Sequence, residues 1–306
     1  MSIDLRHFRC FVAVAEELHF HRAAKKLGVA QPALSRTIKN LENSLGVTLL
    51  ERSNRRVELT EAGRSFLIGC QESLRHTKRI IEDAHRVQQG NVGTLRIGYT
   101  DNAMNGRLPS LLRAFKDQTP DFALLLTHSV TSEQLNQLED GTIDFGFATG
   151  TVSRAGFDFI RIQSERFVCV VYEGHRLALR SSIKLIELAD EPMIQGTKEQ
   201  WQHYYSYLAP LFRNAGFEPK IAQEGLTTSD IQRLVACGIG VALLTEKVVE
   251  SLPPGLIVLQ IEDVDDRLDT IAVWQSNLTN VAKEHFVSFL RKSMHDDTKT
   301  VTAQSK

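Results

Sequence analysis

The first 60 residues show hydrophobic positions at the three-to-four-residue spacing of short amphipathic helices. This pattern predicts a first helix over 5–15, a second over 21–27 and a third over 31–45. Gly28 follows the second helix, and glycine is common at helix C-termini because it adopts a left-handed backbone conformation without steric cost. A helix, a short turn that starts with glycine and a longer helix together predict a helix-turn-helix.

The third predicted helix has an apolar face and a polar face. Leu34, Ile38, Leu41 and Leu45 align on one side at about 100° per residue and should be buried. The other side and its flanks carry groups suited to base edges and phosphates, namely Gln31, Pro32, Ser35, Arg36 and Lys39. The alternative is the solvated face of an ordinary charged helix, but the second helix of a helix-turn-helix is the one that enters the major groove.

Residues 49–59 predict two short strands around a basic turn, a hairpin that we call the wing. Its arginines Arg52, Arg55 and Arg56 could enter an adjacent minor groove, where narrow A·T-rich DNA has a strongly negative potential. An exposed hairpin without DNA contacts is the alternative. The neighbouring helix-turn-helix favours a hairpin that contacts DNA.

A long helix is predicted over 60–89, because Thr60 can cap its start and no proline interrupts it. At ~1.5 Å per residue it would span roughly 45 Å, too long for a connection within one domain. Leu67, Leu74 and Ile81 repeat every seven residues and form a possible heptad seam. We therefore expect a linker helix that pairs two subunits.

From Gly93 onward the pattern changes to alternating strands and helices. Strands are expected at 94–99, 122–128, 143–147, 167–172, 193–195, 220–224, 241–244 and 270–274, and helices at 107–118, 132–140, 183–189, 200–215, 228–237 and 280–294. Two α/β halves joined by two chain crossings predict a clamshell whose cleft binds a small molecule. The halves are expected at about 93–161 with 269–295, and at about 162–268.

Charge divides the chain at the same place. The formal net charge of the 306 residues is −1, which taken alone argues against a nucleic-acid-binding protein. Residues 1–90, however, hold 15 Lys and Arg against 10 Asp and Glu, and the remainder is correspondingly acidic. A basic first part and an acidic second part suggest different partners for the two parts, although an excess of this size could arise by chance.

The remaining sequence signals narrow the class of protein. The four cysteines stand apart, with no Cys-x-x-Cys, so neither a metal site nor a disulfide framework is expected. No apolar run of 18 residues or charged leader is present, so we expect a cytoplasmic protein without membrane contact. There is no Gly-x-Gly-x-x-Gly, Walker loop or Gly-x-Ser-x-Gly elbow. We expect no enzyme activity and no cofactor.

The chain resembles the LysR-type transcriptional regulators. The resemblance is strongest in Leu5-Arg6-His7-Phe8, Ala23-Ala24-x-x-Leu27, Gln31-Pro32-Ala33-Leu34-Ser35-Arg36, Leu49-Leu50-x-Arg52 and Leu59-Thr60-x-Ala62-Gly63. Weaker matches continue in Leu95-x-Ile97-Gly98, Gly141-x-Ile143-Asp144-x-Gly146-Phe147 and Gly238-x-Gly240-Val241-Ala242-Leu243-Leu244. Ala30 departs from the family, in which Ser or Thr is common at this position.

The resemblance implies an α+β multidomain protein. Its parts would be a winged helix-turn-helix at 1–59, a linker and dimerisation helix at 60–89, a two-subdomain effector domain like a periplasmic binding protein at 90–295, and a polar tail at 296–306. Such regulators commonly form homotetramers on promoter DNA and activate transcription when a small inducer enters the cleft. By position, Gln31, Pro32, Ser35 and Arg36 would face the major groove and Lys39 a phosphate.

Effector contacts are expected from the ends of strands on both sides of the cleft. The candidates are Thr100, Asp101, Asn102, Thr131 and Thr149 from one half and Gln195, Gly196, Thr197 and Thr228 from the other. Hydroxyls and helix N-termini bind carboxylates, so a small organic acid is the expected inducer. Thr131 resembles a hydroxyl contact of the branch that senses aromatic-degradation intermediates, although Thr149 stands where that branch often has arginine. Plain capping roles are the alternative for these threonines.

Two other functions remain open from the sequence. Some members of the resembled family switch through a disulfide in the effector domain, and Cys169 and Cys237 are the cysteines of that domain. Both stand in apolar segments and are more readily explained as inert core thiols. A clamshell solute-binding protein is the other alternative.

Overall fold

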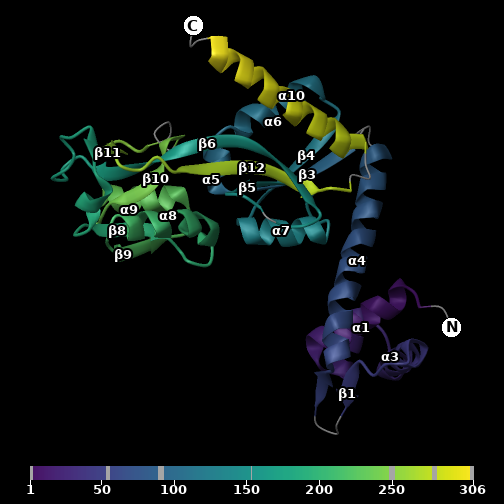
Figure 1. Ribbon diagram of the computed structural model, residues 1–306. Helices are drawn as coiled ribbons and strands as arrows, with labels where there is room; N and C mark the ends of the chain where they lie inside the picture. Colours follow the sequence, from purple (N-terminus) through teal and green to yellow (C-terminus); the bar gives the residue numbers. More distant parts are fainter. Residues whose placement is uncertain are drawn as a thin grey trace. The chain divides into compact units, whose positions relative to one another are not determined.

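The computed structural model describes residues 3–52, 56–88, 93–152, 154–247, 252–277 and 281–303. The chain forms two compact units, residues 1–89 and 90–306 (Figure 1). The first is mostly helical. The second holds a mixed sheet with helices on its faces.

Three short helices build the centre of the first unit: α1 (Leu5–Glu17), α2 (Phe20–Leu27) and α3 (Gln31–Leu45). Asp4 caps α1 by accepting hydrogen bonds from the N–H groups of Arg6 and His7. Gly28 and Gly46 end α2 and α3 in the left-handed conformation, with φ values of 67° and 68°. The expected helix-turn-helix is therefore present.

The wing consists of β1 (Leu50–Arg52) and β2 (Val57–Leu59), which pair antiparallel. The next element, α4 (Glu61–Gln88), starts after Thr60, whose hydroxyl accepts a hydrogen bond from the Gly63 N–H at 2.9 Å. Thr60 thus caps α4 as expected.

The heptad seam expected along α4 is wrong in its first part. Leu67 and Cys70 pack into the core of the helix-turn-helix, and Cys70 is only 1% exposed. The reason is that this end of α4 lies against α1, so its apolar side chains are used within the subunit. Ile80 and Ile81, farther along α4, are exposed.

The second unit contains an eight-stranded sheet. Its order is β4-β3-β5-β12-β6-β11-β7, and β10 also pairs with β6. The strands are β3 (Gly93–Tyr99), β4 (Phe122–His128), β5 (Phe145–Thr149), β6 (Phe157–Tyr172), β7 (Ser182–Ile183), β10 (Ala242–Thr245), β11 (Leu256–Ile261) and β12 (Arg267–Gln275). A separate parallel pair is formed by β8 (Pro192–Gly196) and β9 (Lys220–Gly225). The helices are α5 (Asp101–Asn105), α6 (Leu108–Gln118), α7 (Thr131–Glu139), α8 (Gln202–Asn214), α9 (Thr228–Ala236) and α10 (Val281–Ala303).

Two strands join the halves of this unit. β6 and β12 pair antiparallel, with Phe157 opposite Gln275 at one end and Arg166 opposite Arg267 at the other. β6 then continues and pairs with both β10 and β11. The expected boundaries near 161 and 268 therefore fall inside strands that run without a break from one half into the other.

Each half has its own core. In the first half α6 and α10 cover one face of the sheet and α7 covers the other (Figure 1). The ring of Phe286 lies 4.8 Å from those of Phe115 and Phe145 and links both helices to the sheet. In the second half, side chains of β6 alternate: Cys169 packs in the cluster that contains α8, and Val170 in the one that contains α9.

Several elements differ from the sequence-based predictions. The helix expected at 183–189 is the short strand β7 followed by a 3-10 helix, η1 (Leu185–Leu188). Ile183 pairs with Ile261 of β11, a strand that was not expected, and this distant pairing overrides the local helical pattern. The short helix α5 was not expected either. The last helix continues beyond 294 to Ala303, through part of the expected polar tail.

Candidate functional site

The polar face of α3 is open to solvent in the first unit. Gln31, Pro32, Arg36 and Lys39 are exposed, Ser35 is half-buried, and the opposite face is buried through Leu34, Ile38 and Leu41. Within the described residues, neither Arg36 nor Lys39 pairs with an acidic side chain. Two unpaired cations on an exposed helix can meet phosphates or base edges.

The start of α3 has no side-chain cap. Ala30 occupies the N-cap position, and Pro32 stands in the first turn. The helix is fixed from its other end, because the Glu42 carboxylate accepts the N–H groups of Leu49 and Leu50 at 2.9 and 3.1 Å. This pair of hydrogen bonds ties α3 to the beginning of the wing.

The wing arginines are described only in part. Arg56 has a side chain that is 81% exposed and lies 3.8 Å from Glu58, the geometry of a weak surface ion pair. Arg55 and the side chain of Arg52 lie outside the described residues. Their expected place in a minor groove stays a prediction.

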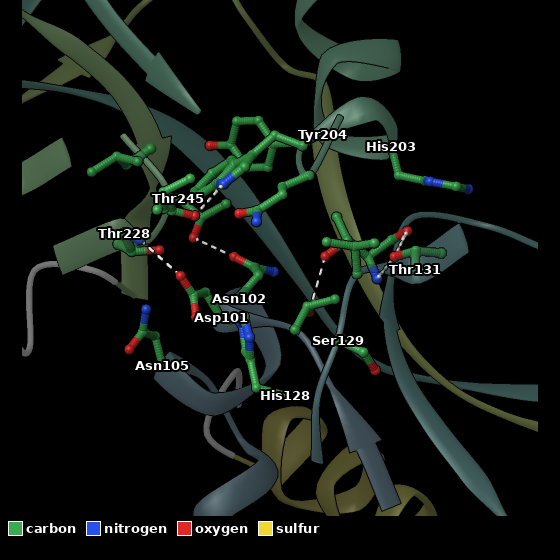
Figure 2. A pocket seen from close by; sticks show the side chains of 17 residues that line it. Asp101, Asn102, Asn105, His128, Ser129, Thr131, His203, Tyr204, Thr228 and Thr245 are labelled. Atoms are coloured by element: carbon green, nitrogen blue, oxygen red, sulfur yellow. Dashed lines mark hydrogen bonds and ion pairs between the residues drawn. The ribbon is translucent and has the colours of Figure 1, made fainter. Parts of the chain in front are cut away.

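The second unit contains a cavity between its two halves (Figure 2). It has about 640 Å³ of empty volume, part of which is open solvent. The lining residues come from the ends of β3, β4 and β5 on one side and from α8, α9 and β10 on the other: Thr100, Asp101, Asn102, Asn105, His128, Ser129, Val130, Thr131, Thr149, Gln200, Trp201, His203, Tyr204, Leu226, Thr228, Leu244 and Thr245.

Three of the expected threonines meet in one wall of the cavity. The hydroxyls of Thr100 and Thr149 are 3.1 Å apart, and the Thr131 hydroxyl accepts the Thr149 N–H at 3.0 Å. Thr131 is the first residue of α7, whose N-cap, Val130, offers no side-chain hydrogen bond. The amides of the first turn of a helix lack intrahelical acceptors, so this end of α7 has backbone N–H donors with partial positive charge, and the Glu133 carboxylate belongs to the same turn.

Asp101 connects the two sides of the cavity. Its Oδ2 accepts the backbone N–H of Thr228, at the start of α9, at 2.8 Å. Its Oδ1 lies 3.0 Å from Nε2 of His128, at the end of β4. The Asp101 carboxylate therefore already binds the N-terminus of α9 at Thr228, a residue that was expected to contact the inducer.

A buried polar network lies behind this wall. The Asn102 side chain accepts the Thr245 hydroxyl at 2.9 Å and donates to Glu165 at 3.2 Å. Glu165 is 2% exposed and also accepts from Gln163 and from the Lys247 N–H. Burial raises the pKa of the Glu165 carboxyl above its ordinary value, and these hydrogen bonds oppose the shift. The network connects the cavity to β6, which belongs to both halves.

The raised pKa of Glu165 predicts a pH-dependent stability. A carboxyl that holds its proton more tightly in the folded state lowers the free energy of unfolding as pH rises through the interval above the ordinary value of 4.5. We expect the difference in unfolding free energy, wild type minus Glu165→Gln, to fall as pH rises above about 4.5. Urea titrations of both proteins at several pH values would measure it. A constant or rising difference would contradict the prediction.

Three expected effector residues do not reach the cavity. Gln195 and Gly196 line a smaller, separate pocket, and Thr197 lines neither. The physical reason is Trp201: its ring covers Gly196 so closely that a Cβ there would lie 2.1 Å from it. The Tyr205 hydroxyl donates to the Gly196 carbonyl at 2.7 Å and closes the same position. The structure thus places none of these three residues on the cavity, and their role as effector contacts stays a prediction.

Comparison with known proteins decides the family. Residues 5–64 match the model of the bacterial regulatory helix-turn-helix protein, lysR family, and residues 88–295 match the LysR substrate binding domain. The chain belongs to the LysR family of transcriptional regulators. It is a DNA-binding regulator with an effector-binding domain and not an enzyme, and the resemblance and fold class inferred from sequence are confirmed.

Individual relatives agree with this. The chain is 33% identical to the HTH-type transcriptional regulator AlsR of Bacillus subtilis strain 168, over 93% of this chain and 94% of that one. It is 38% identical to the uncharacterized HTH-type transcriptional regulator YnfL of Escherichia coli K12, over 80% and 82%. Full-length CbnR, solved with its target DNA complex, matches with a TM-score of 0.75 and 28% identity, covering 95% of this chain and 100% of that one.

Several residues of this LysR-type cavity were not anticipated. His128 ends β4, a strand that was expected, and Ser129 follows it; the carboxyl ends of neighbouring parallel strands meet at one edge of a sheet. That rule could have found them. Trp201, His203 and Tyr204 come from the region of α8, and no local pattern marks them because only the packing of α8 brings them to the cavity.

The cysteines of the effector domain stand in different surroundings. Cys169 is fully buried on β6, and burial raises the pKa of its thiol well above the ordinary value, which keeps it protonated and unreactive. Cys237, which we expected in a core, is exposed at the end of α9. The α9 pattern buries Ile231 and Val235 and leaves the cap position outside. The buried state of Cys169 gives no support to a redox switch.

Among the described residues, no helix is long and apolar enough to cross a lipid bilayer.

Proposed function

We propose that this LysR-type regulator binds promoter DNA through α3 and the wing and activates transcription when a small organic acid enters the cavity of the second unit, in the cytoplasm. The observation that carries the proposal is the polar cavity built from strand ends of both halves. A ligand that contacts both halves stabilises the closed arrangement of the domain relative to the open one. Ligand binding can thereby change the conformation of the regulator.

The proposed DNA contacts follow from the exposed face of α3. Gln31, Pro32, Ser35 and Arg36 would face the major groove, and Lys39 would contact a phosphate. Arg52, Arg55 and Arg56 of the wing would lie at the minor groove. Exposed cationic and amide groups on the second helix of a helix-turn-helix support this arrangement.

The proposed inducer carries a single carboxylate. Its support is the uncapped start of α7 at Thr131, beside the hydroxyls of Thr100 and Thr149. The lining residues, all of them described, include no lysine or arginine. A second acid group would therefore have no strong counter-charge in the cavity. Assignment to the branch that senses aromatic-degradation intermediates stays a prediction.

We also propose that two subunits pair through α4 and that two such pairs form a tetramer. Ile80 and Ile81 are adjacent and exposed on α4, at 56% and 50% of their surface, and contiguous exposed apolar side chains mark interaction surfaces. Pairing of two copies would double the number of recognition helices on the DNA and raise the overall affinity.

A gel shift with the DNA upstream of the protein's own gene tests the DNA-binding part. We expect a specific shift that weakens steeply as salt rises, because neutralised phosphates release counterions. Absence of a shift, or one that salt does not alter, would contradict the proposal. Thermal unfolding of residues 91–306 with small organic acids tests the inducer part, since a ligand bound only by the folded state raises the melting temperature.

A further inference from the structure

The charge of the cavity is unusual for a site that receives an acid. Among its described lining residues Asp101 is the single carboxylate and there is no lysine or arginine; the His128 ring is the basic side chain that contacts Asp101. Burial lowers the pKa of His203, which favours the neutral imidazole. The start of α7 at Thr131 offers backbone N–H groups to an anion in one wall of the cavity. Asp101 places a negative charge in another wall.

Asp101 has unused capacity to accept hydrogen bonds. Each of its oxygens has one protein partner, the Thr228 N–H and the His128 ring, whereas an ionised carboxylate can accept about four hydrogen bonds. Its side chain keeps 24% of its surface exposed. Figure 2 shows Asp101 beside Asn105 and Thr228 on one side of the cavity, with Thr131 and His203 on the other side.

The position of this carboxylate restricts what can bind beside it. A second acid group near Asp101 would meet a like charge, and the N-terminus of α9 that could offset it is already engaged by Asp101. A protonated amine in the same place would gain a charge-assisted hydrogen bond in a partly desolvated site. The Asn105 side chain, which also lines this part of the cavity, can accept a second N–H.

From these observations we propose that the effector carries a protonated amino group that binds Asp101, in addition to its carboxylate. The effector is then an amino acid or another amino-substituted organic acid. This inference rests on the proposed function of the cavity as the inducer site. The expected inducer is then not a plain acid but a molecule with a carboxylate at one end and a protonated amino group at the other.

Asp101 also has a structural role that the experiment must separate from ligand binding. Its hydrogen bond to the Thr228 N–H joins α5 to α9, so its loss changes how the halves meet. A purely structural role predicts that Asp101→Asn weakens every ligand by a similar factor. A role in recognising the amine predicts a loss confined to ligands that carry one.

The test measures binding to the full-length protein by calorimetry, with thermal unfolding as the first screen. The probes are the common amino acids and γ-aminobutyrate, each with its deaminated acid and its decarboxylated amine, for example leucine, 4-methylpentanoate and 3-methylbutylamine. We expect at least one amino acid to bind about tenfold or more tighter than both of its matched analogues, a difference typical of one charge-assisted contact.

Variants sharpen the test. Asp101→Asn should weaken binding of that amino acid about tenfold and leave the matched acid nearly unchanged. Asp121→Asn, which removes an exposed carboxylate outside the cavity, should leave both affinities as they are. Three results would overturn the inference: no amino acid binds, a plain acid binds as tightly as its amino acid, or Asp101→Asn weakens acid and amino acid alike. The gel shift without ligand fails or succeeds independently of these outcomes.

Discussion

Replacing Gly63 by alanine should destabilise the helix-turn-helix unit by about 1–3 kcal/mol or more, the usual cost of forcing extra atoms into a packed site. A Cβ at this position would lie 2.1 Å from the carbonyl oxygen of Leu49. That oxygen also accepts the Thr60 N–H at 3.1 Å, so a shift of the backbone would break the junction between the wing and α4. Thermal unfolding of the full-length protein and its gel shift measure the effect.

Gly69→Ala is the matched control for this prediction. Gly69 lies in the same helix, and a Cβ there would meet no atom within 4 Å. Alanine also favours the helix over glycine by about 1 kcal/mol, so this variant should be as stable as wild type or slightly more stable. If Gly63→Ala unfolded at the same temperature as Gly69→Ala, the close approach of α4 to Leu49 would not be a constraint on the fold.

Arg36→Ala should weaken binding to the specific promoter by about 1–3 kcal/mol per site if the guanidinium reads a base edge, and each pair of subunits presents two such sites. Arg36 is exposed on α3 and, within the described residues, has no acidic partner that would compete for it. Quantitative gel shifts with the promoter and with random DNA at one salt concentration measure the loss. The ratio of the two affinities reports the specificity.

Arg113→Ala controls for the removal of one positive charge, because Arg113 is exposed on α6 in the other unit. It should bind both DNAs as wild type does. An equal loss on promoter and random DNA in Arg36→Ala would assign Arg36 to a phosphate. No loss on either would remove it from the interface.

The helix-turn-helix could be predicted because its signals are local. Gly28 and Gly46 end their helices wherever the rest of the chain lies, and the stripe of Leu34, Ile38 and Leu41 needs only one neighbouring surface to be buried. The seam of α4 could not be predicted in full. Leu67 fits a heptad equally well whether it faces a second subunit or α1, and only the packing of α1 against α4 decides between them.

The cavity was predictable on one side and not on the other. Thr100, Asp101 and Thr149 follow or end parallel strands, whose carboxyl ends meet at one edge by topology alone. Gln195 and Gly196 also end a parallel strand, but the Trp201 ring covers Gly196. The position of the Trp201 ring, at the N-cap of α8, depends on how Tyr204 and Leu208 pack in the core, and no local sequence pattern indicates that packing.

The sequence by itself determined the family, the division into a basic DNA-binding part and an acidic effector part, and most of the helices and strands, because these follow from residue type, periodicity and order along the chain. Only the tertiary structure decided that Asp101 engages the start of α9, that Glu165 is buried behind the cavity, and which residues line its second wall. These facts depend on contacts between residues far apart in the chain, 63 positions for Asn102 and Glu165 and 127 for Asp101 and Thr228, and such contacts form only when both halves are packed.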